Sequence, residues 1–202
     1  MNMKRKSLDE EEEKETWELL DKKPSQVDDI IEMTILENNH IVLHGELNEE
    51  TCNKVCKKLL YLHFHKVENV DVILNTVGGE VYHGLLIFNM MEALKQKGMK
   101  ISITVHGLCA SMGLIILLGG THRYTKEYSR FLLHETASWT YGKVSEMKEG
   151  VKETEEVEKM LNEIITERTK LSVNTLKKNT KKRDWWISSK EALQLGLVEK
   201  IV

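Results

Sequence analysis

The sequence predicts an α/β fold in which strands and helices alternate along the chain and are joined by crossover connections. The prediction rests on three observations. Short aliphatic and β-branched runs recur from residue 41 onward, longer segments with helical apolar spacing separate them, and glycines stand at the junctions. The chain has 202 residues and one proline, and this length suits one compact domain, with or without an appendage.

Each element is expected from its own local pattern. Gly98 is a natural end for the second helix, and the third strand alternates apolar and polar residues as a half-buried strand does. The last helix would open with a capping box at Ser188–Glu191 and end at Gly196. In chain order, the expected elements are a strand at 41–43, a helix at 49–62, a strand at 70–74, a helix at about 81–97, a strand at 101–105, a buried helix at 111–118, strands at 123–125 and 131–133, a long helix at 144–170 and the short helix after Ser188.

The long helix predicted at 144–170 has an uneven pattern. Its second half carries apolar residues at helical spacing, from Val157 to Ile165, whereas its first half is highly charged and has few apolar positions. A helix of this kind is expected to project from its own domain and meet a partner.

The first 37 residues differ from the rest of the chain in charge. They contain 12 acidic and 6 basic residues, including the acidic run Glu10–Glu13, although the whole chain has a net charge of only −3. We therefore expect an acidic arm at 1–37, mobile or helical, and a separate domain at 38–202. A docking tail is the functional alternative for the arm.

Composition argues against several classes of protein. With 41% apolar and 30% charged residues, the chain is expected to be globular rather than disordered. Its longest apolar run, Leu114–Leu118, is far shorter than the roughly 20 residues of a membrane-spanning helix, and no signal peptide is expected. The odd count of three cysteines favours a reducing, cytoplasmic compartment, and the low net charge argues against polyanion binding.

Ser111 is the first candidate for catalysis. It lies in the segment Gly107–Gly113, where the third strand would turn into the buried helix. The helix N-terminus would favour the negative charge that develops when a hydroxyl attacks a carbonyl. The nucleophile-elbow pattern G-x-S-x-G is not met, because Cys109 occupies the place of the first glycine. A small residue at a buried turn is the structural alternative.

His134 and Asp184 are candidates to act with this serine. His134 follows an apolar strand and would remove the serine proton as a general base. Asp184 stands between a basic run and two tryptophans and would orient the imidazole. The structural alternatives are a satisfied core histidine and a surface acid paired with a neighbouring base. In addition, the pair Gly78–Gly79 follows a strand and can expose backbone N–H donors.

Several of these motifs, in this order, resemble the ClpP family of serine peptidases. The similarity covers about residues 40–202. The segments that carry it are Gly78–Gly79, Ala110–Gly113, the strand that ends at His134, Arg183–Trp186 and the closing stretch Glu191–Val198. The resemblance implies a crotonase-like fold of repeated ββα units, with the helix at 144–170 as the family's projecting helix.

The resemblance also implies an activity and its residues. It implies Ser111 as nucleophile, His134 as base, Asp184 as the residue that orients the base, and the N–H groups of Gly79 and Met112 as the oxyanion hole. Family members are serine endopeptidases that stack rings face to face through the projecting helix and cleave peptides or unfolded proteins in an enclosed chamber. No metal or organic cofactor is implied.

The chain departs from the family pattern in three places. Thr76–Val77 stands where the family has Ser-Pro, and Glu135–Thr136 stands where it has Gln-Pro after the histidine. Residues 1–37 do not resemble the axial loops that help to dock unfoldase ATPases, which argues against a Clp-type ATPase partner. The alternatives are a bacteriophage prohead protease of ClpP type, a crotonase-fold enzyme acting on acyl-CoA, and a catalytically silent assembly subunit.

Two further clusters have simpler explanations than ligand binding. A zinc site would use Cys52, Cys56, His63 and His65, but a helical cysteine pair that faces the core explains the cysteines equally well. The five basic residues within 177–183 would bind nucleic acid, but no aromatic residues are interleaved with them, and a solvated face is simpler. We expect no metal, cofactor, nucleic-acid or membrane partner.

Overall fold

The computed structural model describes residues 24–202 and divides the chain into two units between Asn38 and Asn39. Helix α2 (Pro24–Glu37) belongs to the first unit. The acidic run Glu10–Glu13 lies outside the described residues. The second unit holds the sheet and all residues of the candidate site.

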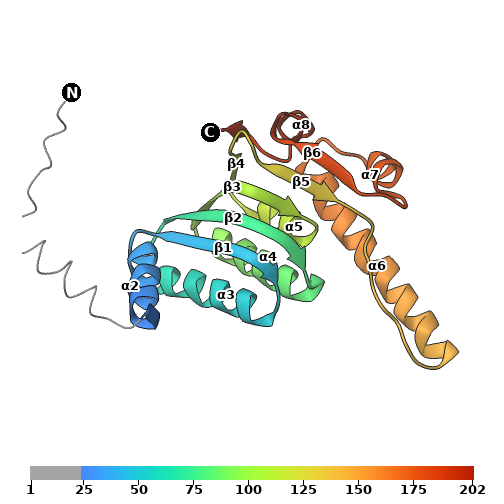
Figure 1. The fold of residues 1–202 in the computed structure, drawn as a ribbon, viewed down its shortest axis with the longest axis horizontal. Coiled ribbons are helices and arrows are strands. Elements are labelled where there is room, and N and C mark those ends of the chain that lie inside the picture. Colours follow the sequence, from blue (N-terminus) through green and yellow to red (C-terminus); the bar gives the residue numbers. More distant parts are fainter. Residues whose placement is uncertain (1–23) are drawn as a thin grey trace, which may run out of the picture. The chain divides into compact units, whose positions relative to one another are not determined.

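The second unit is built on a seven-stranded sheet that forks at its third strand (Figure 1). The main path is parallel and runs in the order β1 (His40–Leu47), β2 (Asn69–Gly79), β3 (Lys100–Ala110), β4 (His122–Thr125) and β7 (Lys200–Ile201). Strand β4 pairs with residues 102–105 of β3. Strand β5 (Arg130–Leu133) pairs in parallel with the last three residues of β3, 108–110. Strand β6 (Trp185–Ser188) then adds to β5 in antiparallel register.

Helices connect the strands. They are α3 (Glu49–Phe64), α4 (Val81–Gln96), α5 (Met112–Gly119), α6 (Val144–Arg168), α7 (Val173–Thr180) and α8 (Ser189–Leu195). Helices α3 and α4 lie along one face of β1–β3, α4 packs against both α3 and α5, and α5 contacts α6 (Figure 1). The long α6 extends away from the sheet, as the projecting helix was expected to do (Figure 1).

The core lies between this sheet and its helices. Side chains along β2 alternate between buried and exposed, which is the period expected of a strand that is packed on one face. All eight residues of α5 are buried, so this helix forms the centre of the core. The largest fully buried side chains are Phe131, Ile41, Leu43, Leu47, Leu59, Leu62, Leu74, Ile87, Met91, Leu94, Ile101 and Ile103. Among residues 24–202, no helix combines the length and the apolar character that crossing a bilayer requires.

The structure confirms the α/β alternation and extends two of the predicted strands. Strands β2 and β3 each have 11 residues, because the segments expected as glycine loops continue to pair. Thr76 pairs with Cys109, and Leu47 pairs with Gly79. Three elements of the second unit were not predicted, α7, β6 and β7, and the long helix ends at Arg168 rather than at residue 170.

One residue of the basic run at 177–183 has a structural role. The Arg183 guanidinium donates hydrogen bonds to the carbonyl oxygens of Asn179 (3.0 Å) and Lys178 (2.8 Å), near the C-terminus of α7. These carbonyls belong to the last turn of a helix, where intrahelical donors run out. Arg183 therefore caps α7, while the four lysines of the run are exposed.

Candidate active site

The turn between β3 and α5 holds Ser111 in a strained conformation. Its φ is +53° and its ψ is −123°, a region that side-chain-bearing residues rarely adopt and that costs about 1–3 kcal/mol. The turn is held by the Ser111 N–H, which donates to Leu132 O at 2.9 Å, and by Ser111 O, which accepts from the Leu114 N–H at 3.0 Å. The Ser111 hydroxyl makes no capping bond to the helix. The turn therefore presents a free hydroxyl at the N-terminus of α5.

Helix α5 supplies a positive potential at this hydroxyl. Its first residue is Met112, whose N–H is among the first N–H groups of the helix and has no intrahelical acceptor. Because α5 is wholly buried, its N-terminal dipole is poorly screened by water. The Met112 N–H is thus a chemically suitable donor for an oxyanion formed at Ser111.

The glycine pair at the end of β2 lies against the serine turn. At Gly78, which has φ +88°, an added Cβ would come within 2.7 Å of the Ser111 Cβ and 2.8 Å of Ala110 O. At Gly79, which has φ +152°, an added Cβ would collide with the backbone of Leu47. Both the positive φ and the lack of space exclude any side chain at Gly78 and Gly79. The backbone of β2 can therefore approach Ser111 closely.

Thr76 fixes this glycine segment through both its hydroxyl and its methyl group. Its side chain is 2% exposed, and its hydroxyl donates to Gly45 O and accepts from the Gly78 N–H at 3.0 Å. Its methyl group leaves no room for a Cβ at Gly113 in α5. Thr76 thus holds the glycine segment to β1 and packs it against the helix that follows Ser111.

Cys109 does not compete with Ser111 as a nucleophile. Its side chain is fully buried, and this burial strongly raises the pKa of its thiol. Since the thiolate is the reactive form, Cys109 is inert at neutral pH. It serves as a small apolar residue under the serine turn.

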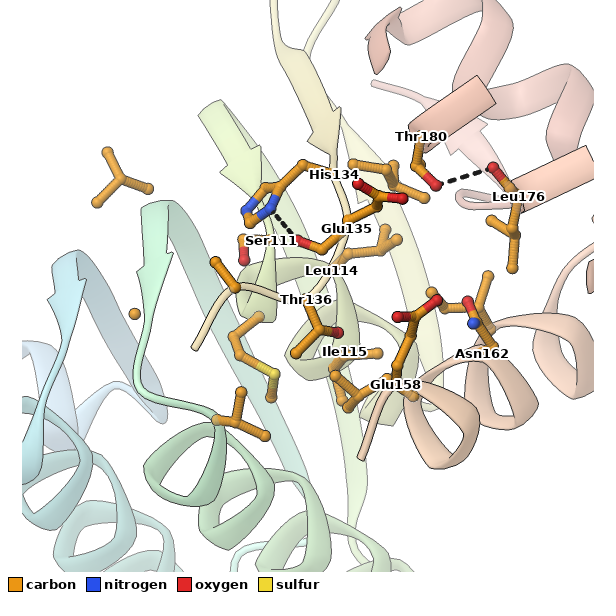
Figure 2. A pocket seen from close by; sticks show the side chains of 18 residues that line it. Ser111, Leu114, Ile115, His134, Glu135, Thr136, Glu158, Asn162, Leu176 and Thr180 are labelled. Carbon is orange, nitrogen blue, oxygen red and sulfur yellow. Dashed lines mark hydrogen bonds between the residues drawn. The ribbon is translucent and has the colours of Figure 1, made fainter. Parts of the chain in front are cut away.

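His134 directly follows β5 and lines the same cavity as Ser111. Figure 2 shows its imidazole on the Ser111 side of the cavity, while its Nδ1 lies 2.6 Å from Glu135 O. A carbonyl oxygen can only accept a hydrogen bond, so Nδ1 carries a proton, and in the neutral imidazole Nε2 is then the acceptor. This is the tautomer that a general base for a serine hydroxyl requires.

Asp184 is brought to the same region by strand pairing. Strand β6 pairs with β5 so that Trp185 faces Leu133, and these two residues directly adjoin Asp184 and His134 in the chain. Its carboxylate is exposed. In the part of the chain that the structure describes, no hydrogen bond joins His134 to Asp184 or to Ser111.

The cavity has a volume of about 300 Å³ and brings four of the five predicted site residues together. They are Gly79, Ser111, Met112 and His134, and Asp184 is not among the lining residues. The rest of the wall comes from α5, the segment after β5, α6 and α7. The α6 contribution, which includes Glu158 and Asn162, was missed in the sequence, although these two residues stand four apart in an apolar helical stripe, a spacing that sets both on one face.

The cysteines proposed for zinc have a different environment. Cys52 and Cys56 are buried, and burial is the main cause that raises the pKa of both thiols, to about 11 for Cys52. Neighbouring Cys56 and Glu80 raise the Cys52 value further. Within residues 24–202, no group of three or more histidine, cysteine or acidic side chains is arranged to hold a metal ion.

Comparison with known proteins assigns the chain to a family. Residues 22–202 match the sequence profile of the family described as Clp protease. The "ATP-dependent Clp protease proteolytic subunit 3" of Rhizobium etli is 31% identical over 173 residues, which cover 85% of this chain and 87% of the relative. The "ATP-dependent Clp protease proteolytic subunit 2" of Treponema denticola is 30% identical over 177 residues, 86% of each protein. The chain therefore belongs to the Clp protease family.

Proposed function

We propose that this chain is a serine endopeptidase subunit in which Ser111, His134 and Asp184 act as a catalytic triad. The observation that carries the proposal is the strained turn at Ser111, which presents a free hydroxyl at the N-terminus of a buried helix and in one cavity with His134. Membership of the Clp protease family supports hydrolysis of peptide bonds as the reaction.

Each residue would have one chemical task. His134 takes the proton of Ser111 as the serine oxygen attacks the peptide carbonyl, and the N–H groups of Gly79 and Met112 bind the resulting oxyanion. His134 then gives this proton to the departing amine, which leaves an acyl-enzyme. Water attacks the acyl-enzyme with His134 again as base, and Ser111 is regenerated.

Asp184 would act on the charge of the histidine. When His134 becomes an imidazolium, a carboxylate that accepts its Nδ1–H stabilises the positive charge more than a neutral carbonyl does. Nδ1 donates to Glu135 O in the structure, and the pairing of Leu133 with Trp185 supports a place for Asp184 near His134. We infer that the imidazole exchanges the Glu135 carbonyl for the Asp184 carboxylate when the site is at work.

Assembly into stacked rings around a chamber is part of the same proposal. Helix α6 and the segment before it expose large apolar side chains, including Trp139 (90% exposed), Tyr141 (93%), Val144 and Val151. Such a concentration of apolar surface is typical of an interface. Light scattering on the purified protein is expected to give a mass many times that of one chain.

Substrates and partners follow from the relatives by analogy. Peptides and unfolded proteins would be the substrates, and both relatives are named as ATP-dependent, so a Clp ATPase is the partner to test. Addition of such an ATPase with ATP is expected to speed degradation of a folded, tagged protein. The three cysteines of the chain are unpaired and buried, which supports a cytoplasmic location.

Replacement of the nucleophile tests the proposal directly. Ser111→Ala is expected to lower hydrolysis of fluorogenic peptides by roughly 10⁶-fold and to abolish labelling by a fluorophosphonate, detected by intact mass. The matched control is Ser102→Ala, which changes a serine near the start of β3 and should keep both activities. Equal labelling of the wild type and Ser111→Ala, or no labelling of either, would refute the assignment.

A further inference from the structure

The wall of the Ser111 cavity contains an acidic side chain from the projecting helix. Glu158 and Asn162 stand one helical turn apart on α6, and both line the cavity. Figure 2 shows their side chains extending from α6 toward the segment that follows His134. The same wall carries the apolar side chains of Leu114 and Ile115, together with Thr136 (Figure 2). A carboxylate on a mostly apolar wall is unusual, because such a position removes part of its hydration.

The Glu158 carboxylate has no partner to offset its charge. In the described residues it makes neither a hydrogen bond nor an ion pair within 4 Å. Lys159 and Lys177 line an adjoining hollow of about 570 Å³ that Glu158 also borders, yet neither forms an ion pair with it. The side chain is half-buried, so water only partly screens it.

The charge of the cavity as a whole has one sign. Its lining includes two carboxylates, Glu135 and Glu158, and neither a lysine nor an arginine. One oxygen of Glu135 already accepts the Lys182 N–H at 3.0 Å. Glu158 is therefore the carboxylate of the lining with neither oxygen engaged by another described residue, and so the more available one for a ligand.

We propose that Glu158 makes this cavity select a basic substrate side chain, lysine or arginine, at the residue whose carbonyl Ser111 attacks. The inference rests on the proposed peptidase function. In the intermediate, the attacked carbonyl carbon of the substrate is bonded to the Ser111 oxygen. Only Cα separates this carbon from the side chain of the same substrate residue, so that side chain enters the cavity that Ser111 lines. A lysine side chain passes its methylenes along the apolar wall and sets its ammonium beside Glu158.

Apolar and acidic substrate side chains are expected to bind this cavity less favourably than a basic one. An apolar chain of the same length fills the cavity but strips water from Glu158 without replacing it. An acidic chain adds like-charge repulsion. A hydrogen bond to a charged group in such a setting is worth enough to change rates about tenfold or more. The Asn162 side chain adds an amide oxygen that can accept a second N–H from the substrate.

The test compares fluorogenic peptides that differ only in the residue before the scissile bond. The pair is lysine against norleucine, which has the lysine methylenes without the ammonium. For the wild type, we expect kcat/KM to be about tenfold higher for lysine. Glu158→Gln keeps the size of the side chain and should reduce this ratio to about one, whereas Glu158→Lys should favour norleucine. The matched control, Glu155→Gln, changes an exposed carboxylate on the same helix that borders only the adjoining hollow, and should keep the wild-type ratio.

Two outcomes separate the inference from the proposed function. If peptides are cleaved in a Ser111-dependent way, but lysine is not preferred or the preference survives Glu158→Gln, the role of Glu158 is overturned and the peptidase stands. If neither hydrolysis nor fluorophosphonate labelling depends on Ser111, both ideas fail together. The ratio of kcat/KM for lysine and norleucine in the wild type tests the preference by itself. The proposal can therefore be refuted even if a Glu158 variant fails to fold.

Discussion

Leu133 faces Trp185 in the last pair of the antiparallel strands β5 and β6, and these two residues directly adjoin His134 and Asp184 in the chain. His134 and Asp184 are 50 positions apart in the chain, and the pairing of two four-residue strands brings their neighbours together. Yet the imidazole Nδ1 bonds to Glu135 O rather than to the carboxylate. A hydrogen-bonded Ser-His-Asp site would require the imidazole to leave this carbonyl for the Asp184 carboxylate.

Asp184→Asn tests whether this pairing matters for catalysis. An amide keeps the size of the side chain but cannot stabilise the imidazolium, so kcat is expected to fall by up to about 10⁴-fold, with unchanged assembly. Steady-state hydrolysis of a fluorogenic peptide measures the fall in kcat. Asp71→Asn is the control, because Asp71 is exposed on β2 and should leave kcat as it is. A D184N enzyme as fast as the wild type would remove Asp184 from the triad.

Thr76→Val tests whether a hydroxyl does the work of the missing proline. Valine has the same shape but leaves Gly45 O and the Gly78 N–H without the bonds that Thr76 provides. We expect a loss of about 1–3 kcal/mol in stability, measured by urea unfolding, together with a fall in kcat because the glycine segment loosens. Thr104→Val on the neighbouring strand is the control, with an effect within about 0.5 kcal/mol. Unchanged kcat in T76V would show that the segment is held by other contacts.

Much of this fold was accessible from the sequence because its elements have strong local patterns. The helix at 49–62 and the strand at 131–133 were predicted within two residues of their observed bounds, because the spacing of apolar residues marks both elements. The ends of β2 and β3 were not found, because their glycines read locally as turns. They are strands only through pairing with distant segments, such as Thr76 with Cys109.

The site was predicted unevenly for the same reason. Ser111 stands out because a strand must turn there into an apolar helix, and its positive φ is a consequence of that turn. Asp184 has no local signal, because its place depends on the register of β6, an element that was not predicted at all. Glu158 was hidden in the charged pattern of α6, and only the packing of α6 against α5 shows that it faces a cavity.

Ser111→Gly tests whether the serine turn stores strain. Glycine adopts a positive φ freely, whereas alanine at this position bears the full cost of the conformation. Part of the gain is offset by the greater freedom of glycine in the unfolded chain. We expect S111G to be more stable than S111A by about 1 kcal/mol, which is a rise in Tm of roughly 2–4 °C at equal protein concentration. At Ser102, in extended strand, the order should reverse, and the same order at both sites would argue against strain at Ser111.

The base of the projecting helix is fixed by a partly buried ion pair. Arg168, the last residue of α6, donates to the Glu92 carboxylate at 2.8 Å and to Leu118 O at 3.1 Å, and its guanidinium lies 4.7 Å from the centre of the Phe88 ring. Lys95 Nζ is 2.7 Å from the same Glu92 oxygen. Arg168 therefore ties α6 to α4 and to the end of α5, the helix that carries Met112 at its start.

Glu92→Gln is expected to make the thermal stability of the protein less dependent on pH below about pH 6. Partial burial alone would raise the pKa of Glu92, but hydrogen bonds and charge from Arg168 and Lys95 outweigh it and hold the pKa below the ordinary value of 4.5. Because the folded state lowers this pKa, the stabilisation is complete above the ordinary value and is lost as pH falls through the folded one. Thermal unfolding between about pH 6 and pH 3 should therefore show a steeper decline for the wild type than for E92Q. Glu50→Gln removes a fully exposed pair with Lys54 and should follow the wild type, since solvent screens such a pair. Parallel curves for the wild type and E92Q would show that Glu92 adds nothing to the attachment of α6.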